Sequence, residues 1–174
     1  MDDWGIEELF RFFLEDNDYH DYNDDAYQKS TDNTSDSKQY ELRENGRKAW
    51  KAHMANDDEN ALYIINQELS KDPNHPIHLN IKGLVLSSLK RYDEAKESFD
   101  KSLEADRNDF VIENKAKMIK IWANELYNQN KDLKMAINLL NESIAELLKL
   151  SKTNEDIESY NKLLFSIYNK LNQD

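Results

Sequence analysis

The sequence contains very few of the residues that shape sheets and turns, and none that form disulfides. Its 174 residues include only three glycines and two prolines. Sheet-rich folds use many such residues at their turns, so this scarcity predicts a helical protein. Cysteine is absent altogether. Its absence excludes disulfides, thiol chemistry and zinc sites with cysteine ligands.

Long apolar runs are also missing. No stretch of the chain approaches the roughly 20 apolar residues needed to cross a bilayer. The N-terminus has neither the basic region nor the apolar core of a signal peptide. We therefore expect a cytoplasmic protein without a membrane partner.

The charge of the chain is uneven. The net charge is -12, yet residues 1–41 alone hold 13 acidic and 3 basic side chains. Acidic surfaces repel phosphate backbones, so we expect no nucleic-acid partner. Residues 15–38 are rich in Asp, Asn and Ser and have no aliphatic run. Such a composition predicts a flexible acidic linker in front of a helical domain at residues 39–174.

The segment before this linker, residues 1–14, predicts a short amphipathic helix on an acidic background. Its apolar residues recur at helical spacing; they are Trp4, Ile6, Leu9, Phe10 and Phe13. A helix of about three turns is marginal on its own in water. We therefore expect this segment to need a surface on which to lie.

From residue 39 onward the sequence repeats with an offset of 34 residues. Residues of similar size recur at this offset: Ala49 with Gly83, Ala61 with Ala95, Ile65 with Phe99, and Leu69 with Leu103. A third copy is less regular, because Ala136 follows Ala95 by 41 residues. This difference predicts that the first helix of the third copy is about two turns longer than the others.

A 34-residue period of paired helices resembles the tetratricopeptide repeat (TPR) family. The stretch GLVLSSLKRYDEAKESFDKSLEAD, residues 83–106, is the part most similar to the family pattern. The resemblance implies an all-α fold, a solenoid of helical hairpins with about three repeats. Residues 154–172 would close it as a capping helix, with Glu158, Asn161 and Lys162 giving a polar outer face.

The resemblance also implies where a ligand would bind, because the first helix of each TPR pair lines a concave groove that takes peptides. The implied groove residues are Arg43, Arg47, Trp50, Met54, Ile77, Asn80, Ile81, Leu84, Asn114, Lys115 and Met118. Some family members grip chaperone C-termini with a Lys/Asn/Arg clamp. Of the residues at the clamp positions here, Gly46, Trp50, Ile81, Val111 and Lys115, only Lys115 is basic. We therefore expect no binding of chaperone tails through that clamp.

An apolar groove with a basic rim suits an amphipathic helix with acidic flanks. Residues 1–14 are such a helix, and the linker is long enough to let them reach the groove. The sequence thus predicts a protein-interaction adaptor whose groove is filled by a partner or by its own N-terminal helix. Docking within one chain and exchange between two copies both remain open. Two alternatives are a small client-holding chaperone, similar in size and acidity to three-repeat secretion chaperones, and a regulator whose acidic tail mimics nucleic acid.

No motif in the sequence predicts catalysis. It contains no glycine-rich phosphate loop, nucleophile elbow or HExxH zinc helix. His75 and His78 form a pair of metal-ligand type, but two histidines without a third ligand make a poor site. Asp21, Asn23 and Asp25 resemble the start of a calcium loop, but Ala26 stands where the loop needs glycine. We interpret both as polar turn residues, and we expect a non-enzyme without metal or cofactor.

Overall fold

The structure is a computed structural model that describes residues 34–150 and 154–173, with side chains at 44–150 and 157–173. The chain divides into two units, Met1–Glu41 and Leu42–Asp174. The amphipathic segment 1–14, with Trp4, Ile6, Leu9, Phe10 and Phe13, lies outside the described residues. So do Asp21, Asn23 and Asp25, together with most of the predicted linker 15–38.

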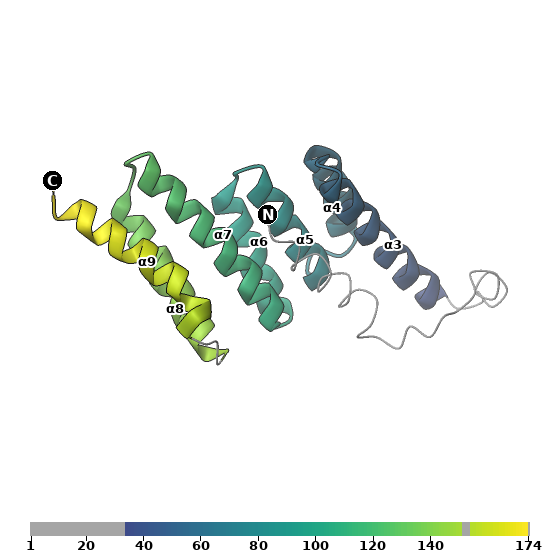
Figure 1. Cartoon of the computed structure of the whole chain (residues 1–174). Helices are drawn as coiled ribbons and strands as arrows, with labels where there is room; N and C mark the ends of the chain where they lie inside the picture. Colours follow the sequence, from purple (N-terminus) through teal and green to yellow (C-terminus); the bar gives the residue numbers. More distant parts are fainter. Residues whose placement is uncertain (1–33, 151–153, 174) are drawn as a thin grey trace. The chain divides into compact units, whose positions relative to one another are not determined.

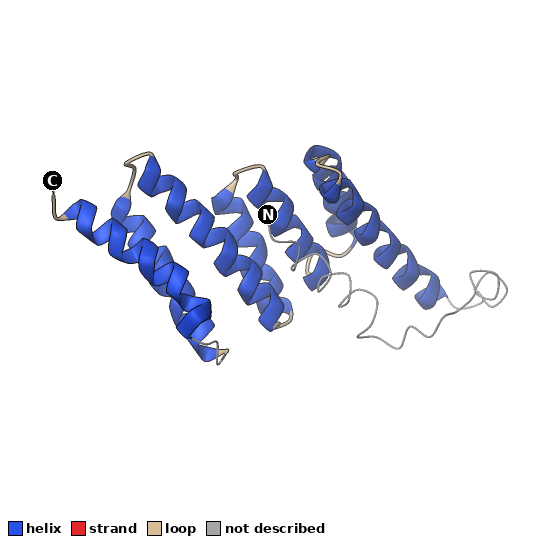
Figure 2. Cartoon of the chain, viewed as in Figure 1, coloured by secondary structure: helices blue, strands red, loops and turns tan. Residues whose placement is uncertain are grey.

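All secondary structure in the described part of the chain is helical, as Figure 2 shows. The helices are α3 (Thr34–Met54), α4 (Asp58–Lys71), α5 (Pro76–Ser88), α6 (Tyr92–Ala105), α7 (Asp109–Asn128), α8 (Leu133–Lys149) and α9 (Asn154–Leu171). Because α3 begins at Thr34, the prediction of a linker was wrong for residues 34–38. Thr34, Ser35 and Asp36 are residue types that favour a helix N-terminus, which accounts for this earlier start.

Within the unit Leu42–Asp174, consecutive helices form hairpins. Figure 1 shows α3, α5, α7 and α9 in one layer and α4, α6 and α8 behind them. Helix α5 packs on α6 and α7 on α8, while α5, α7 and α9 follow one another side by side. A hydrogen bond of 3.0 Å from Asn45 Nδ2 to Glu68 Oε1 joins α3 to α4. This arrangement confirms the predicted all-α TPR-type solenoid.

The turn inside each hairpin has the same backbone conformation. Asn56, Lys90 and Asn130 follow the first helix and have positive φ angles of 60°, 59° and 49°. In each turn the next amide closes a loop over the last helical turn, as from Arg91 N to Leu86 O at 2.9 Å. Asparagine tolerates this left-handed conformation better than most residues, whereas lysine does not. The turn of the α5–α6 hairpin is therefore the strained one.

Local sequence signals explain where several helices begin. Pro76 occupies the first position of α5, where its missing N–H costs nothing. Asn108 caps α7, because its side-chain oxygen accepts a hydrogen bond of 2.9 Å from Phe110 N. Asp132 caps α8 in the same way, accepting from Met135 N at 2.9 Å.

The core lies between the two layers and uses the residues that the period predicted. Ala49, Ala61, Ile65, Ala95, Phe99, Ala136 and Leu140 are all fully buried. The closest approach is between Gly83 and the Phe99 ring. A Cβ placed on Gly83 would lie 2.7 Å from that ring. Only glycine therefore lets α5 lie this close to α6.

The third hairpin is longer than the second, as the 41-residue offset predicted. Helix α7 has 20 residues where α5 has 13, and α8 has 17 where α6 has 14. Its core cluster contains Ala123, Ala136 and Leu140 and extends to Ile157, Tyr160 and Ile167 of α9. Helix α9 thus continues the same core.

The outer face of α9 is less polar than we expected from the sequence. Glu158, Asn161 and Lys162 are exposed as predicted. Phe165, however, is 67% exposed on the same helix, and Tyr168 is 45% exposed. A separate finding concerns membranes. None of the helices in the described residues is both long and apolar enough to cross a bilayer.

Candidate functional site

Helix α7 shows most clearly which surface the hairpins leave open, because neighbouring helices cover its other sides. Asn114 contacts α5, and the Trp122 ring stacks on Tyr92 of α6 with centroids 5.7 Å apart. Ala123 packs into the core with α8. On the side of α9, the Lys120 ammonium lies 4.9 Å from the centre of the Tyr160 ring. What remains is an exposed strip along one side of α7.

We call the corresponding strip along α3, α5 and α7 the first-helix face. Its members are accessible side chains that recur at helical spacing: Arg47 and Met54 on α3, Ile77, Leu84 and Ser88 on α5, and Lys117, Ile121 and Asn124 on α7. The face combines four apolar side chains with two basic ones. It contains no acidic member.

The basic groups on this face are largely unengaged by the folded domain. Among the described residues, no acidic side chain lies within salt-bridge distance of Lys117. Arg47 makes one pair, at 3.4 Å to Glu44 on its own helix. Exposed pairs of this kind contribute little stability. Their charge is therefore available to a partner.

Helix α6, in the opposite layer, has the opposite character. It carries Asp93, Glu94, Glu97, Asp100 and Glu104 against two lysines. Helix α6 is thus acidic, whereas the first-helix face carries basic groups. This pattern favours an acidic partner on the first-helix face and discourages one on the other side.

The structure places only some of the predicted groove residues on this face. Arg47, Met54, Ile77 and Leu84 lie there. The side chain of Arg43 is outside the described ones. Three residues predicted to form the groove floor, Trp50, Ile81 and Met118, are instead buried core, and Ile81 has no exposed surface. The prediction was wrong for these three because neighbouring helices close over them.

Asn80 and Asn114 are buried as well, and they bind each other. Asn114 Nδ2 donates to Asn80 Oδ1 at 3.4 Å. The two residues are 34 positions apart and lie on α5 and α7. Their amides satisfy one another between neighbouring first helices, so they position the repeats and are not open to a ligand.

Lys115 was predicted on the groove rim but points to the second helices. Its ammonium lies 2.6 Å from Asp100 Oδ1 and 3.1 Å from Glu142 Oε1. Burial disfavours the charged form of Asp100, but hydrogen bonds from Lys115 and Lys96 outweigh it and hold the Asp100 pKa below its ordinary value. Lys115 therefore ties α7 to α6 and α8.

The sequence analysis missed the members of the face on the long helix α7, which are Lys117, Ile121 and Asn124. Ile121 is the most exposed aliphatic side chain of this group, at 50%. A signal for them exists in the turns. Lys90 and Asn130 occupy the same turn position and are 40 residues apart, so Ile77 corresponds to Lys117 and Leu84 to Asn124. Counting back from the turn would have placed α7 correctly.

The two histidines considered as metal ligands contact each other. His75 and His78 stack face to face with ring centroids 4.0 Å apart. His75 caps α5, with its Nδ1 accepting from His78 N at 3.4 Å, and His78 is buried beside Gly46. Within residues 34–150 and 154–173, no three His, Asp or Glu side chains group in a way that could hold a metal ion.

A small hollow lies between α6, α7 and α8. Its volume is about 80 Å³, and its walls include Ile112, Lys115, Glu142 and Ser143. This is room for two or three water molecules and too little for a peptide. The hollow is therefore no candidate for a peptide site.

Comparisons with known proteins agree with this architecture. Residues 79–109 match the sequence profile described as Tetratricopeptide repeat. Among solved structures, the chain is similar to the TPR2B domain of yeast Sti1 in its complex with pHsp70, with a TM-score of 0.51 and 16% identity. That match covers 77% of this chain and 98% of the Sti1 chain. Among curated proteins, none matches the chain significantly.

The matched residues run from α5 to the start of α7 and include the Gly83–Phe99 contact and the strained turn at Lys90. The same hairpin geometry recurs on either side of them. The chain therefore contains a tetratricopeptide repeat at residues 79–109, set within a TPR-type helical fold.

Proposed function

We propose that this protein is an interaction module that binds an acidic amphipathic helix on its first-helix face. The observation that carries the proposal is the composition of that face. Met54, Leu84 and Ile121 offer apolar contact, Arg47 adds positive charge, and Lys117 has no acidic partner among the described residues. A helix with an apolar stripe and acidic flanks matches both features.

The sequence of residues 1–14 predicts such a helix within this chain. Phe10 and Phe13 belong to its apolar stripe, and Asp2, Asp3, Glu7 and Glu8 supply negative charge. We propose that this segment is the first occupant of the face and that an external partner must displace it. Tethering raises its effective concentration to the millimolar range, so even weak intrinsic binding would keep the face covered.

A binding titration tests the proposal. The chain lacking residues 1–33 keeps every described helix and is titrated with a labelled peptide of residues 1–16. We expect a Kd well below 1 mM, which corresponds to more than about 4 kcal/mol of binding free energy. Ile121→Asp and Lys117→Glu should each weaken binding several-fold. No detectable binding at millimolar peptide would refute occupation by residues 1–14.

The matched control is Tyr63→Asp. Tyr63 is 65% exposed but lies on α4, in the other layer. This variant should bind the peptide as the unmodified domain does. An equal loss in the Tyr63 and Ile121 variants would show that the effect is not specific to the first-helix face.

Two further ligands separate this proposal from its alternatives. A peptide ending in Glu-Glu-Val-Asp should not bind in the micromolar range, because Lys115 is engaged by Asp100 and Glu142. An aggregating client protein tests the chaperone alternative. Stoichiometric suppression of its aggregation would favour a client-holding chaperone over an adaptor.

A further inference from the structure

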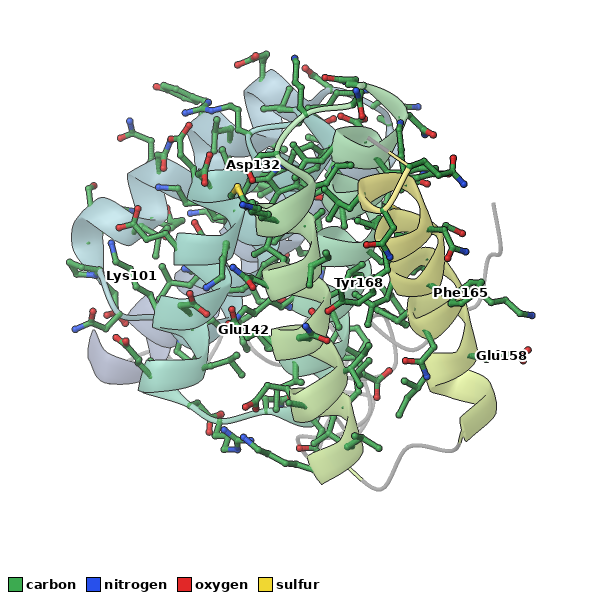
Figure 3. The ribbon with its side chains drawn as sticks, turned by 90° about the vertical axis from the view of Figure 1, so that its left-hand side faces the viewer. Lys101, Asp132, Glu142, Glu158, Phe165 and Tyr168 are labelled. Atoms are coloured by element: carbon green, nitrogen blue, oxygen red, sulfur yellow. The ribbon has the colours of Figure 1, made fainter. Side chains whose placement is uncertain are left out.

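The last described helix, α9, packs on α8 and α7. Helices α5 and α7 are each followed by a second helix, α6 and α8, but the described residues supply no second helix after α9. Figure 3 looks onto this end of the chain, with α8 and α9 nearest the viewer, Phe165 on the side of α9 away from α8, and Tyr168 between α8 and α9. This end is distinct from the first-helix face.

The exposed side chains at this end form one stripe. Glu158, Asn161, Phe165 and Tyr168 follow one another at spacings of three and four residues, so they share one side of α9. Helix α8 adds Leu148, which is 56% exposed and lies one turn after Ile144 in the core shared with α9. We call these five residues the end face.

The end face is unusual for the end of a solenoid. Terminal repeats normally present a polar outer surface, which prevents further stacking. Here two aromatic rings and a leucine are open, while Glu158 is neutralised by Lys162 at 2.7 Å on the same helix. Contiguous exposed apolar groups of this kind mark interaction surfaces.

We propose that the end face binds a second copy of this chain, with α9 packed antiparallel against its symmetry mate. A two-fold axis perpendicular to the helices makes the two α9 helices antiparallel, the same relation as in each hairpin. The stripe is also self-complementary. Its four α9 residues are symmetric about position 163, so Glu158 faces the second copy's Tyr168 and Asn161 faces its Phe165.

This register pairs suitable groups and avoids like charges. The Tyr168 hydroxyl can donate to the Glu158 carboxylate of the other copy, a strong type of hydrogen bond. The two Phe165 rings bury against polar and apolar neighbours near the axis. No carboxylate of the stripe faces another, so the contact is compatible with this acidic chain.

The size of the contact sets its strength. Helix α9 has 18 residues, which makes it about 27 Å long at 1.5 Å per residue. One helix with a flanking leucine buries less than the roughly 800 Å² per partner of a standard interface. The dimer is therefore weak, forming in the micromolar range and reversing on dilution.

Sedimentation of the full chain over a wide concentration range tests the proposal. The unmodified chain should pass from monomer to dimer as its concentration rises. Phe165→Glu should remain monomeric at the highest concentration, with a melting temperature close to that of the unmodified chain because Phe165 is exposed. Tyr63→Glu, at a residue equally exposed on α4, should dimerise normally.

Cross-linking fixes the geometry and separates the end face from the first-helix face. The chain has no cysteine, so Asn161→Cys and Asn124→Cys each introduce a single thiol, one on each face. A short bismaleimide should link Asn161→Cys chains into dimers and leave Asn124→Cys chains monomeric. An unmodified chain that stays monomeric throughout, or a dimer that survives Phe165→Glu, would overturn the proposal while leaving the peptide titration unaffected.

Discussion

The second and third hairpins solve one packing problem with different residues. In the second, Gly83 of α5 lies against the large ring of Phe99. In the third, counting from the turn puts Ala123 in the place of Gly83, and the smaller Leu140 replaces Phe99 in the same core cluster. The two residue pairs have a similar combined volume, although the residues differ. The close approach of the helices is thus specified by volume.

Among the changes proposed here, Gly83→Ala should lower the stability of the protein most. Its new Cβ would lie within 2.9 Å of three atoms of the buried Phe99 ring. We expect a net loss of about 2 kcal/mol of unfolding free energy, since overpacking outweighs the better helix propensity of alanine. Chemical denaturation of the variant measures this loss.

The double variant Gly83→Ala with Phe99→Leu recreates the residue pair of the third hairpin. It should recover part of the stability lost in Gly83→Ala alone. A double-mutant cycle with a coupling energy near zero would contradict the volume argument. The reverse change, Ala123→Gly, should cost only about 1 kcal/mol because nothing then clashes.

The second and third hairpins also differ in the hydrogen bonding of two corresponding buried serines. Ser102 Oγ donates to Pro76 O at 2.8 Å and is fully buried. Ser143, its counterpart 41 residues later, has no hydrogen-bond partner for its buried Oγ among the described residues. The reason is the length of α7. The position of Pro76 is taken there by Ala116, whose carbonyl lies inside a continuous helix.

Ser102→Ala should therefore destabilise the protein, and Ser143→Ala should not. The first change leaves a buried carbonyl without its donor, at a cost of about 1–2 kcal/mol. The second removes an unsatisfied hydroxyl and should be neutral or slightly stabilising. Thermal unfolding of the two variants side by side measures the difference, and equal losses would contradict the account.

The hairpin turns give a smaller contrast. Lys90 has the left-handed conformation that Asn56 and Asn130 adopt more readily. Lys90→Asn should raise stability by about 0.5–1 kcal/mol, although it removes the exposed pair between Lys90 Nζ and Glu125 at 2.6 Å. Asn130→Lys should lower stability by a similar amount. A loss of stability in Lys90→Asn would show that the ion pair outweighs the backbone strain.

The smallest expected change is in the pH dependence of stability. It arises at the junction of the second and third hairpins, where Lys115 bridges Asp100 and Glu142. Burial opposes ionisation of Asp100, but Lys115 and Lys96 hold its pKa below the ordinary 3.8. A carboxyl group with a lowered pKa stabilises the fold above that ordinary value and loses the contribution as pH falls through the folded value. Asp100→Asn should thus flatten the acid limb of the stability profile by about 0.5 kcal/mol. An unchanged acid limb would show that the junction contributes nothing.

Periodicity predicted the fold because the core repeats with the chain. Ala61, Ala95 and Ala136 mark the starts of second helices, and all three are fully buried. A small residue followed four positions later by a large apolar residue identifies each second helix, even where the third hairpin departs from the 34-residue period. Local chemistry adds the helix starts, as at Pro76 and Asp132.

The candidate site was harder to predict because exposure depends on neighbours that the repeat pattern does not encode. Ile81 is covered because Gly46 on α3 has no side chain to hold the helices apart. On α5 the residue in place of Gly46 is Asn80, whose amide turns to Asn114, and Ile121 stays half exposed. Lys115 was misplaced because it was aligned from the start of α7 and not from the turn.

Mapping a bound peptide residue by residue tests the central claim most directly. Backbone NMR signals of the chain lacking residues 1–33 are followed while the peptide of residues 1–16 is added. The account predicts that the largest shifts fall at Arg47, Leu84 and Ile121, with Tyr63 on α4 unchanged. Shifts concentrated on α4 and α6, or none at millimolar peptide, would contradict it.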